Sequence, residues 1–350
     1  MPETDLASDN YAPVHPAIVA AIAEVNTGHQ PSYGADPTTV KLTRVLEEEL
    51  GQAVTVLPAL TGTGANVVGV TALTPRWGAV VTSSHGHMIG EEGGAPVRLS
   101  GIPLLPVPSA NGKLDVADLE RIDWHDGFVH SPQATTLSIA NTTELGTVYT
   151  PDEIAALCRW AHARGMLVHL DGARIFNALA ATGASLADMT VRAGVDVFSI
   201  GATKTGALAA EAVVVANPSV TGADFVHKFL MQLPSKARFI SVQVLALFTD
   251  ELGLRLAAHA NEMARSLAQQ LTDRARDGRI PAPEFTQEVE SNQIFLRLPA
   301  DVAARMRRNV HFYDWDASRS EVRWVTAWDT SVEDISAFAD LVERAYRERG

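Results

Sequence analysis

The chain has 350 residues, 46% of them hydrophobic, and a formal net charge of −13 at pH 7. A chain of this length is usually too long to fold around a single hydrophobic core, so we expect one large domain and one smaller domain. The acidic balance excludes nucleic acid as the main partner, because a phosphate backbone is bound by clustered Lys and Arg.

Signals for membrane insertion and export are missing from the sequence. No apolar run approaches the length that crosses a bilayer, and residues 1–5, Met-Pro-Glu-Thr-Asp, do not resemble a signal peptide. We therefore expect a soluble, cytoplasmic protein with no membrane partner. The single cysteine, Cys158, excludes an internal disulfide framework and a cysteine-based metal cluster.

The first half of the chain begins with helices and then alternates between strands and helices. Residues 16–25 predict a short helix, and residues 38–50 predict a longer one that ends at Gly51. The alternating segments that follow are strands at 54–60, 79–83 and 137–140, an apolar run at 127–130, a helix at 65–73 and a helix or loop around Met88. This alternation is typical of a mostly parallel sheet covered on both faces.

A glycine-rich loop, Thr61-Gly-Thr-Gly-Ala-Asn66, separates the first strand from its helix. Backbone N–H groups at such a helix N-terminus could hold one phosphate, although strand-to-helix turns also contain glycine for steric reasons alone. Val67 stands where the dinucleotide fingerprint has its third glycine, and no Gly-Lys-Ser/Thr follows. The loop therefore favours a small phosphorylated cofactor over a dinucleotide.

Two further strands end in candidate functional residues. The segment Thr150-Pro-Asp-Glu153 predicts a capping box, and the helix that it starts should stop at Gly165. Next comes a strand that ends at Asp171, and the apolar run 195–200 leads to Lys204.

Lys204 is the most informative residue of the chain, since only five of its 28 Lys and Arg residues are lysines. Asp171 lies 33 residues earlier, a separation that fits one β-α-β crossover. Both side chains could then lie at the carboxyl ends of neighbouring parallel strands, where open α/β sheets bind ligands. An acid for a ring cation and a lysine for an imine are what pyridoxal phosphate requires, although Asp171 could instead cap the following helix.

The pattern changes beyond about residue 252. A long helix is expected at 254–276, followed by the segment Ser291-Asn-Gln-Ile-Phe-Leu-Arg297. A helix is then expected near 300–308, short strands at 310–314 and 321–327, and a last helix from Val332. We expect a large α/β domain with its N-terminal arm at residues 1–255, and a small α+β domain at residues 256–350.

Several motifs together resemble one family, the low-specificity L-threonine aldolases, which use pyridoxal 5'-phosphate and are grouped with the β-eliminating lyases. The resemblance runs from Ser8 to about Trp328. Its anchors are Tyr33-Gly-Ala-Asp-Pro37, Thr61-Gly-Thr-Gly-Ala-Asn66, His87, residues 91–96, residues 169–177, Lys204, Arg238 and Arg323. The resemblance implies the aminotransferase-like fold (fold type I), with a mixed, mostly parallel sheet.

The resemblance also assigns roles residue by residue. Lys204 would bind the cofactor covalently, Asp171 would pair with its pyridine nitrogen, and His87 would stack on its ring. Gly62 and Thr63 would bind the phosphate, helped by Thr203 and Arg238. The substrate carboxylate would be held by Arg323 and Ser8, and Arg174 would reach this carboxylate or the cofactor's phenolic oxygen. His87 could also be a core histidine, and Arg323 a surface arginine.

The implied reaction is cleavage of a β-hydroxy-α-amino acid, such as L-threonine or L-allo-threonine, to glycine and an aldehyde. It needs a base beside the β-hydroxyl group, and imidazole has a suitable pKa. His87 and His130, which aligns with a second family histidine, are the candidates, and we expect them to act jointly.

Relatives in this family share active sites between subunits. Tyr33, which would contact substrate, and Arg238 would enter the site of the adjacent subunit, so a homodimer is implied and a tetramer is expected. Two segments depart from the family. Residues 140–146, Ala-Asn-Thr-Thr-Glu-Leu-Gly, replace a stretch that often contains Glu-Asn-Thr-His, and residues 232–238 keep an arginine and a lysine for the phosphate, but with the lysine at a shifted position. No spacing typical of metal ligands is found.

Other functions stay open at the level of sequence. An aromatic β-eliminating lyase or an aminotransferase of the same fold would use the same lysine and aspartate. A nicotinamide-dependent dehydrogenase and a catalytically inactive binding protein are alternatives of other classes.

Overall fold

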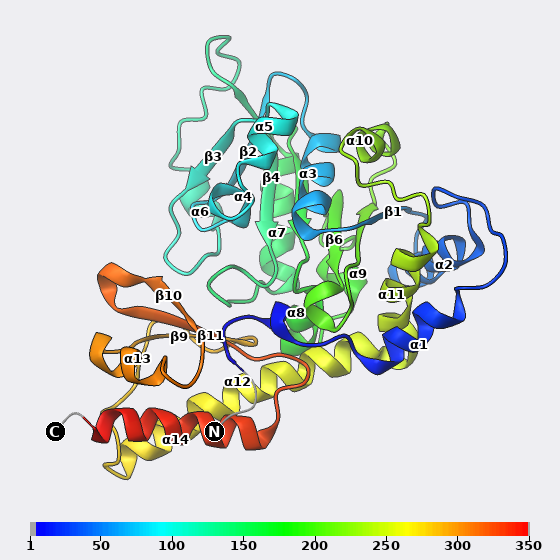
Figure 1. Ribbon diagram of the computed structural model, residues 1–350. Coiled ribbons are helices and arrows are strands. Elements are labelled where there is room, and N and C mark those ends of the chain that lie inside the picture. The colour runs from blue at the N-terminus through cyan, green and yellow to red at the C-terminus, as the bar shows by residue number, and fades with distance from the viewer. Residues whose placement is uncertain (1–4, 349–350) are drawn as a thin grey trace.

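A seven-stranded sheet forms the centre of the computed structural model, which describes residues 5–348 (Figure 1). Its strand order is β1-β7-β6-β5-β4-β2-β3. The strands are β1 (Thr55–Ala59), β2 (Gly78–Ser83), β3 (Leu104–Val107), β4 (Gln133–Ala140), β5 (Leu167–Asp171), β6 (Val197–Gly201) and β7 (Glu211–Val215). Only β7 runs antiparallel to its neighbours, so the sheet is mixed but mostly parallel, as expected.

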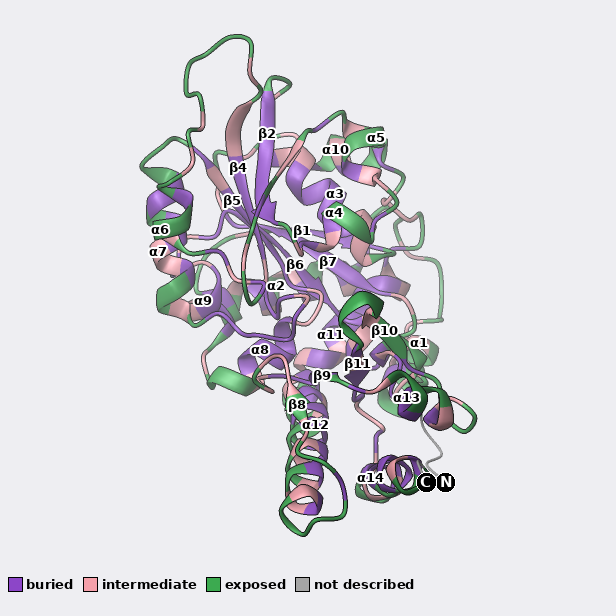
Figure 2. Cartoon of the chain, turned by 90° about the vertical axis from the view of Figure 1, so that its left-hand side faces the viewer, coloured by how far each residue is buried: buried purple, intermediate pink, exposed green. Residues whose placement is uncertain are grey.

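Helices cover both faces of this sheet. One face packs against α1 (Pro16–Glu24), α2 (Pro37–Leu50), α7 (Pro151–His162), α8 (Ile175–Thr182), α9 (Leu186–Met189) and α11 (Arg238–Phe248). The other face packs against α3 (Gly62–Leu73) and α10 (Ala223–Phe229). Side chains of β6 alternate between the two cores, with Phe198 and Ile200 in one and Val197 in the other. The strands are therefore buried on both sides, as the purple centre of Figure 2 shows.

Three short helices lie along the edge formed by β2 and β3. They are α4 (His87–Gly90), α5 (Ala95–Ser100) and α6 (Val116–Leu119). The first of them begins four residues after β2 ends, so it stands at the carboxyl edge of the sheet.

A second, antiparallel sheet with the order β10-β11-β9-β8 forms a smaller C-terminal unit. Its elements are β8 (Glu284–Phe285), β9 (Gln293–Arg297), α13 (Ala300–Met306), β10 (Tyr313–Asp316), β11 (Glu321–Val325) and α14 (Val332–Arg347). These elements share a core of their own, in which Trp324 and Phe338 are fully buried.

One long helix, α12 (Leu252–Arg276), joins the two cores. Its first turns contribute Leu252 and Ala257 to the large core, and its later turns contribute Leu267 and Leu271 to the C-terminal core. The predicted boundary near residue 255 thus falls inside a continuous helix, and it stays a prediction.

The N-terminal arm packs differently from the expected arrangement. Leu6 belongs to the core of the C-terminal unit, and its carbonyl oxygen accepts a hydrogen bond from the backbone N–H of Val325. The arm therefore crosses from the C-terminal unit to the large domain, to which it was assigned as a whole. Residues 1–4, which carry most of the expectation about a signal peptide, lie outside the described residues.

Most predicted elements are confirmed. The capping box at Thr150 and Glu153 is present, and Gly51 ends α2 in a left-handed conformation. The prediction that residues 127–130 continue the strand pattern is wrong, because these residues form turns before β4. Within residues 5–348, no helix combines the length and apolarity needed to span a membrane, and no cluster of three or more His, Cys, Asp or Glu side chains could hold a metal ion.

Candidate active site

Lys204 lies in the 3-10 turn η2 (Thr203–Thr205), directly after the end of β6. Its ammonium group makes no hydrogen bond or ion pair with any residue that the structure describes, and it faces a cleft of about 530 Å³. This volume is within the range of about 300–1,000 Å³ that is typical of small-molecule sites. Burial, followed by the positive charge of Arg174, lowers the pKa of Lys204. A lowered pKa favours the neutral amine, which is the nucleophilic form.

Asp171 ends β5, the parallel neighbour of β6, and lines an inner pocket together with Lys204. Its Oδ2 accepts a hydrogen bond of 2.8 Å from Asn66 Nδ2, and its Oδ1 accepts one of 2.9 Å from the backbone N–H of Ala173. The second bond satisfies a backbone N–H that precedes α8, and α8 has no side-chain cap, so Asp171 does not cap the following helix. Asp171 and Lys204 are separated by a single crossover and, as predicted, both line the inner pocket.

His87 begins α4 and forms the opposite wall of this inner pocket. Its Nδ1 lies 3.1 Å from Oε1 of Glu92, whose side chain is fully buried. The same carboxylate oxygen accepts a 2.8 Å hydrogen bond from Asn66 Nδ2. The hydrogen bond with Glu92 raises the pKa of His87. His87 is therefore an oriented side chain of the pocket and not a core histidine.

Two arginines reach the cleft from different parts of the chain. Arg174 is held by Asp9 through two hydrogen bonds, Nε to Oδ2 at 2.6 Å and NH2 to Oδ1 at 2.9 Å. Arg323, on β11, has a buried Nε atom with no hydrogen-bond partner, and its guanidinium lies 5.3 Å from the centre of the Trp315 ring. Ser8 lines the cleft beside both arginines. A guanidinium at a cleft wall whose Nε is bonded to none of the described residues fits an anionic ligand such as a carboxylate.

The glycine loop supplies a third kind of binding group. Thr61 caps α3 by accepting a hydrogen bond from the backbone N–H of Gly64, whereas Gly62 and Thr63 line the inner pocket. A side chain added at Gly62 would meet nothing within 4 Å, so the space beside its backbone is open. The positive end of a twelve-residue helix therefore faces the pocket, which suits a phosphate group.

Four predicted site residues are not brought to this cleft. The Thr203 hydroxyl donates to Glu211 Oε1 at 2.7 Å and does not line the pocket. Tyr33 and Arg238 lie in neighbouring segments outside the cleft, where the Tyr33 N–H donates to the Ser235 carbonyl oxygen.

His130 is the clearest departure from expectation. It is exposed, packs edge-on against Phe128, and belongs to the loop before β4 at the top of Figure 1. The pocket, in contrast, contains Ala140 at the carboxyl end of β4. An eight-residue strand spans roughly 26 Å, so the structure does not place His130 beside His87.

Sequence reasoning missed the residues that hold the site together. They are Asp9, which clamps Arg174; Glu92, which bonds His87; Asn66, which links Glu92 to Asp171; and Glu144, which lies at the pocket wall. Asn66 and Glu92 belong to two of the motifs that carry the family resemblance, but no role was predicted for either residue. Glu144 lies in residues 140–146, one of the two segments that depart from the family pattern, and this departure was its only signal.

These residues fit pyridoxal phosphate. Lys204 offers an unpaired amine, Asp171 a buried carboxylate for a ring cation, and the Gly62 backbone an open anion cradle. The unpartnered Nε of Arg323 provides the cation that an amino acid carboxylate would need.

Comparison with known proteins agrees with this arrangement. Residues 5–296 match the model of the family described as beta-eliminating lyase. The chain is 34% identical to the low specificity L-threonine aldolase of Pseudomonas aeruginosa over 336 residues, which cover 95% of each protein. It is also 34% identical to the enzyme of the same name from a Pseudomonas species over 327 residues, 93% of this chain and 92% of that protein.

A solved structure of Leishmania major threonine aldolase superposes with a TM-score of 0.89 at 28% identity, over 97% of this chain and 98% of that one. The expected fold class is thereby confirmed, since the match includes both the mixed sheet and the C-terminal unit. With the family match extending across most of its length, the chain belongs to the beta-eliminating lyase family.

Proposed function

We propose that the protein is a pyridoxal-phosphate-dependent aldolase that cleaves L-threonine, L-allo-threonine or a related β-hydroxy-α-amino acid to glycine and an aldehyde. The observation that carries the proposal is that Lys204 faces both an inner pocket, which the buried Asp171 lines, and an outer cleft, which Arg323 lines. The similarity to proteins named threonine aldolase over almost the whole chain supports the same choice.

The surroundings of each side chain in the site favour one role in binding the cofactor. Lys204 would hold the cofactor, Asp171 would bind its pyridine nitrogen, and Gly62 and Thr63 would hold its phosphate. When bound, the cofactor supplies an acceptor for the electron pair that the broken Cα–Cβ bond leaves on Cα. His87, fixed by Glu92, would cover one face of the ring.

The substrate carboxylate would lie between Arg323 and Ser8, with Arg174 beside them. Asp9 already occupies two donors of Arg174, so Arg323 is the stronger binding group. A carboxylate anchored there holds Cα in place and leaves the β-carbon directed to the remaining cleft wall. Within one chain, His130 lies beyond the amino ends of the strands and away from His87, so its joint action as a base stays a prediction.

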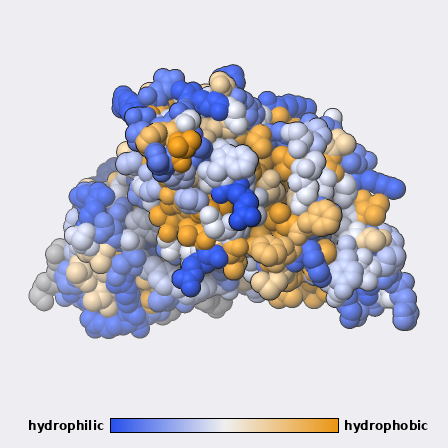
Figure 3. All heavy atoms as spheres, turned by 90° about the horizontal axis from the view of Figure 1, so that it is seen from above, coloured by the Kyte–Doolittle hydropathy of each residue, from blue (hydrophilic) through white to orange (hydrophobic). Residues whose placement is uncertain are grey.

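We also propose that the working enzyme is a homodimer or a tetramer of this chain in the cytoplasm. Large apolar side chains outside the cleft are exposed, among them Phe225 (76%), Phe229 (69%) and Met231 (74%). Figure 3 shows apolar side chains gathered over part of the face that is seen from above. Tyr33 and Arg238 lie outside their own cleft, which suits a role in the adjacent subunit. The single, buried Cys158 fits a reducing compartment.

The test is product analysis with purified protein supplied with pyridoxal phosphate. L-threonine and L-allo-threonine should yield glycine and acetaldehyde in equal amounts, and Lys204→Ala should remove the visible absorption of bound cofactor and lower activity by a factor on the order of 10³ or more. Lys41→Ala, at an exposed lysine of α2, serves as the control. Release of ammonia and a keto acid would instead indicate a β-eliminating lyase, and amino transfer to a keto acid an aminotransferase.

A further inference from the structure

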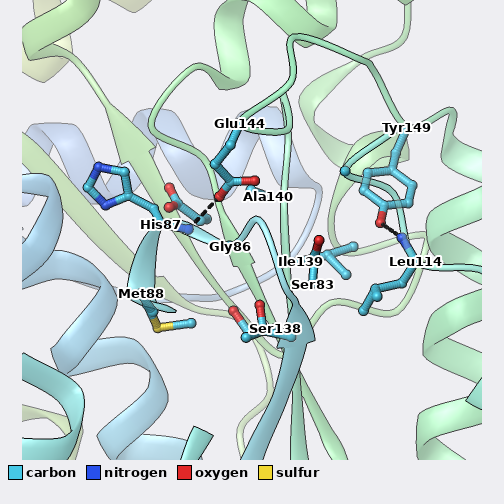
Figure 4. A pocket seen from close by; sticks show the side chains of 13 residues that line it. Ser83, Gly86, His87, Met88, Leu114, Ser138, Ile139, Ala140, Glu144 and Tyr149 are labelled. Atoms are coloured by element: carbon cyan, nitrogen blue, oxygen red, sulfur yellow. Dashed lines mark hydrogen bonds between the residues drawn. The ribbon is translucent and has the colours of Figure 1, made fainter. Parts of the chain in front are cut away.

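Glu144 lines the cleft, but none of the roles predicted from the sequence belongs to it. It lies in the loop between β4 and α7, and it lines both the inner pocket and the outer cleft together with His87, Arg174 and Lys204. Its Oε1 accepts a 2.7 Å hydrogen bond from the backbone N–H of His87. Figure 4 shows its carboxylate directed at the start of α4, next to the His87 side chain.

The loop that carries Glu144 is held on both sides. The Thr143 N–H donates to the Thr147 carbonyl oxygen, the two threonine hydroxyls lie 2.7 Å apart, and both residues are buried. Gly146 closes the turn with a φ of +75°, and a Cβ there would lie 2.9 Å from Cβ of Gln293. A side chain on such a rigid turn presents its carboxylate to the cleft in one place.

The electrostatic surroundings of Glu144 are unusual for an acid. Among the described residues it has no ion pair, whereas Asp9 and Glu153 each have a cationic partner. The titratable groups that act on it or are acted on by it are Asp171, His87, Arg174 and Tyr149, and Lys204 lines the same pocket. Burial, followed by the negative charge of Asp171, raises the pKa of Glu144 to about 7.

His87 is less suited than Glu144 to accept a proton. Its Nδ1 is bonded to Glu92, and this hydrogen bond raises the pKa of His87, so the imidazole remains protonated over a wider pH range. A cationic imidazole has no free acceptor atom. The other cleft carboxylate near α4, Glu91, is exposed at the mouth of the cleft, and Asp171 is bonded to Asn66.

We infer that Glu144 is the catalytic base that removes the proton of the substrate's β-hydroxyl group, an inference that rests on the proposed aldolase function. The proton passes from the hydroxyl oxygen to a carboxylate oxygen of Glu144. The oxygen then forms the aldehyde double bond while the Cα–Cβ bond breaks and its electron pair stays on Cα. Cα takes up one proton from the surroundings to give glycine, and Glu144 releases the proton that it accepted, so the substrate divides into glycine and aldehyde with no net change in protons, oxidant or reductant.

The decisive variant is Glu144→Gln, whose amide oxygen can still accept the hydrogen bond from the His87 N–H. We expect cleavage to slow by about 10²- to 10⁴-fold, the usual contribution of a general base. In the wild type, kcat/KM should rise with pH through about 7, since the base must be deprotonated, and this rise should be lost in Glu144→Gln. The control is Glu48→Gln, at an exposed glutamate of α2 outside the cleft, which should keep both the rate and the pH profile.

A second measurement does not depend on turnover. Infrared difference spectra of cofactor-free protein should show protonated-carboxyl absorption that disappears near pH 7, to which Glu211 also contributes, because burial raises the pKa of Glu211 to about 7 as well. Glu144→Gln should lose only the share of this absorption that belongs to Glu144, whereas Glu48→Gln should lose none of it. Formate added to Glu144→Ala should restore part of the cleavage rate in a saturable manner, because a small carboxylate can enter the space of the missing side chain.

The outcomes separate this inference from the proposed function. If the wild type forms no glycine from any β-hydroxy amino acid, the aldolase proposal fails. If the wild type cleaves threonine and Glu144→Gln cleaves it at a similar rate with an unchanged pH profile, Glu144 is not the base and only this inference is overturned. Loss of the pH dependence in Glu48→Gln would overturn it as well.

Discussion

Single side chains in the cleft owe their chemistry to their partners rather than to their residue type. Two glutamates show this. Glu92 is buried against His87 and Asn66, and Glu144 receives one backbone N–H. The first therefore stabilises a neighbouring cation, whereas the second is left free to exchange a proton.

The pair formed by His87 and Glu92 makes a testable contribution to pH dependence. Its hydrogen bond raises the pKa of His87, so its stabilising effect is fully present below the ordinary histidine value and is lost as pH rises through the raised value. We expect Glu92→Gln to lower the pKa of His87, as followed by NMR titration of its ring protons in cofactor-free protein. The matched control is Glu91→Gln, which should leave the His87 titration in place; equal shifts in both variants would contradict the assignment.

The carboxyl ends of β5 and β6 determine the distance between the two cofactor-binding side chains. The Gly201 N–H donates to the Gly172 carbonyl oxygen at 2.9 Å, and the Gly172 N–H donates to Ser199 Oγ at 2.9 Å. A Cβ at Gly201 would lie 2.3 Å from the backbone oxygen of Ala173. Because backbone atoms crowd this point, the strand ends can approach only where side chains are missing.

Gly201→Ala should therefore push β6 away from β5 and separate Lys204 from Asp171. We expect a loss of about 1–3 kcal/mol in the free energy of unfolding, measured in urea, together with weaker binding of pyridoxal phosphate. Gly90→Ala is the control for stability, since a Cβ there meets nothing within 4 Å. An unchanged cofactor affinity in Gly201→Ala would show that the strand ends tolerate displacement.

At the level of the complete molecule, the cleft is assembled from segments that are far apart in the chain. The Asp9 and Arg174 side chains meet across 165 residues, and Arg323 comes from the C-terminal unit. The arm, the large domain and the C-terminal unit must all dock before the substrate site exists. Tyr33 and Arg238 remain outside it, which a single chain does not explain.

Mixing two inactive variants would test whether active sites are shared between subunits. Lys204→Ala and Arg238→Ala should each be weakly active alone, but co-expression should form hybrids in which one site carries both defects and the other carries none. Activity should then recover to about a quarter of the wild-type value for a randomly mixed dimer. Hybrids that form, as shown by differently tagged chains, but stay inactive would place Arg238 in a role within its own subunit.

Local patterns in the sequence were enough to predict much of the fold. The crossover between Asp171 and Lys204, the helix start at Thr150 and the helix stop at Gly51 follow from hydrophobic periodicity and capping chemistry over short stretches. Such patterns act between near neighbours in the chain, so they are visible without a structure. The antiparallel insertion of β7 between β1 and β6 was not visible, because strand order depends on distant pairings.

The sequence by itself determined the alternating architecture, the family and the lysine and aspartate on which the proposed cofactor site rests. Only the tertiary structure decided which residues surround them: it separated His130 from the cleft and brought Glu144 into it. It also placed Asp9 against Arg174 and Glu92 against His87. The physical reason is that hydrogen bonds and burial between distant segments leave no periodic signal in the chain. They nevertheless set the pKa of each side chain, and with it the chemistry that each residue can perform.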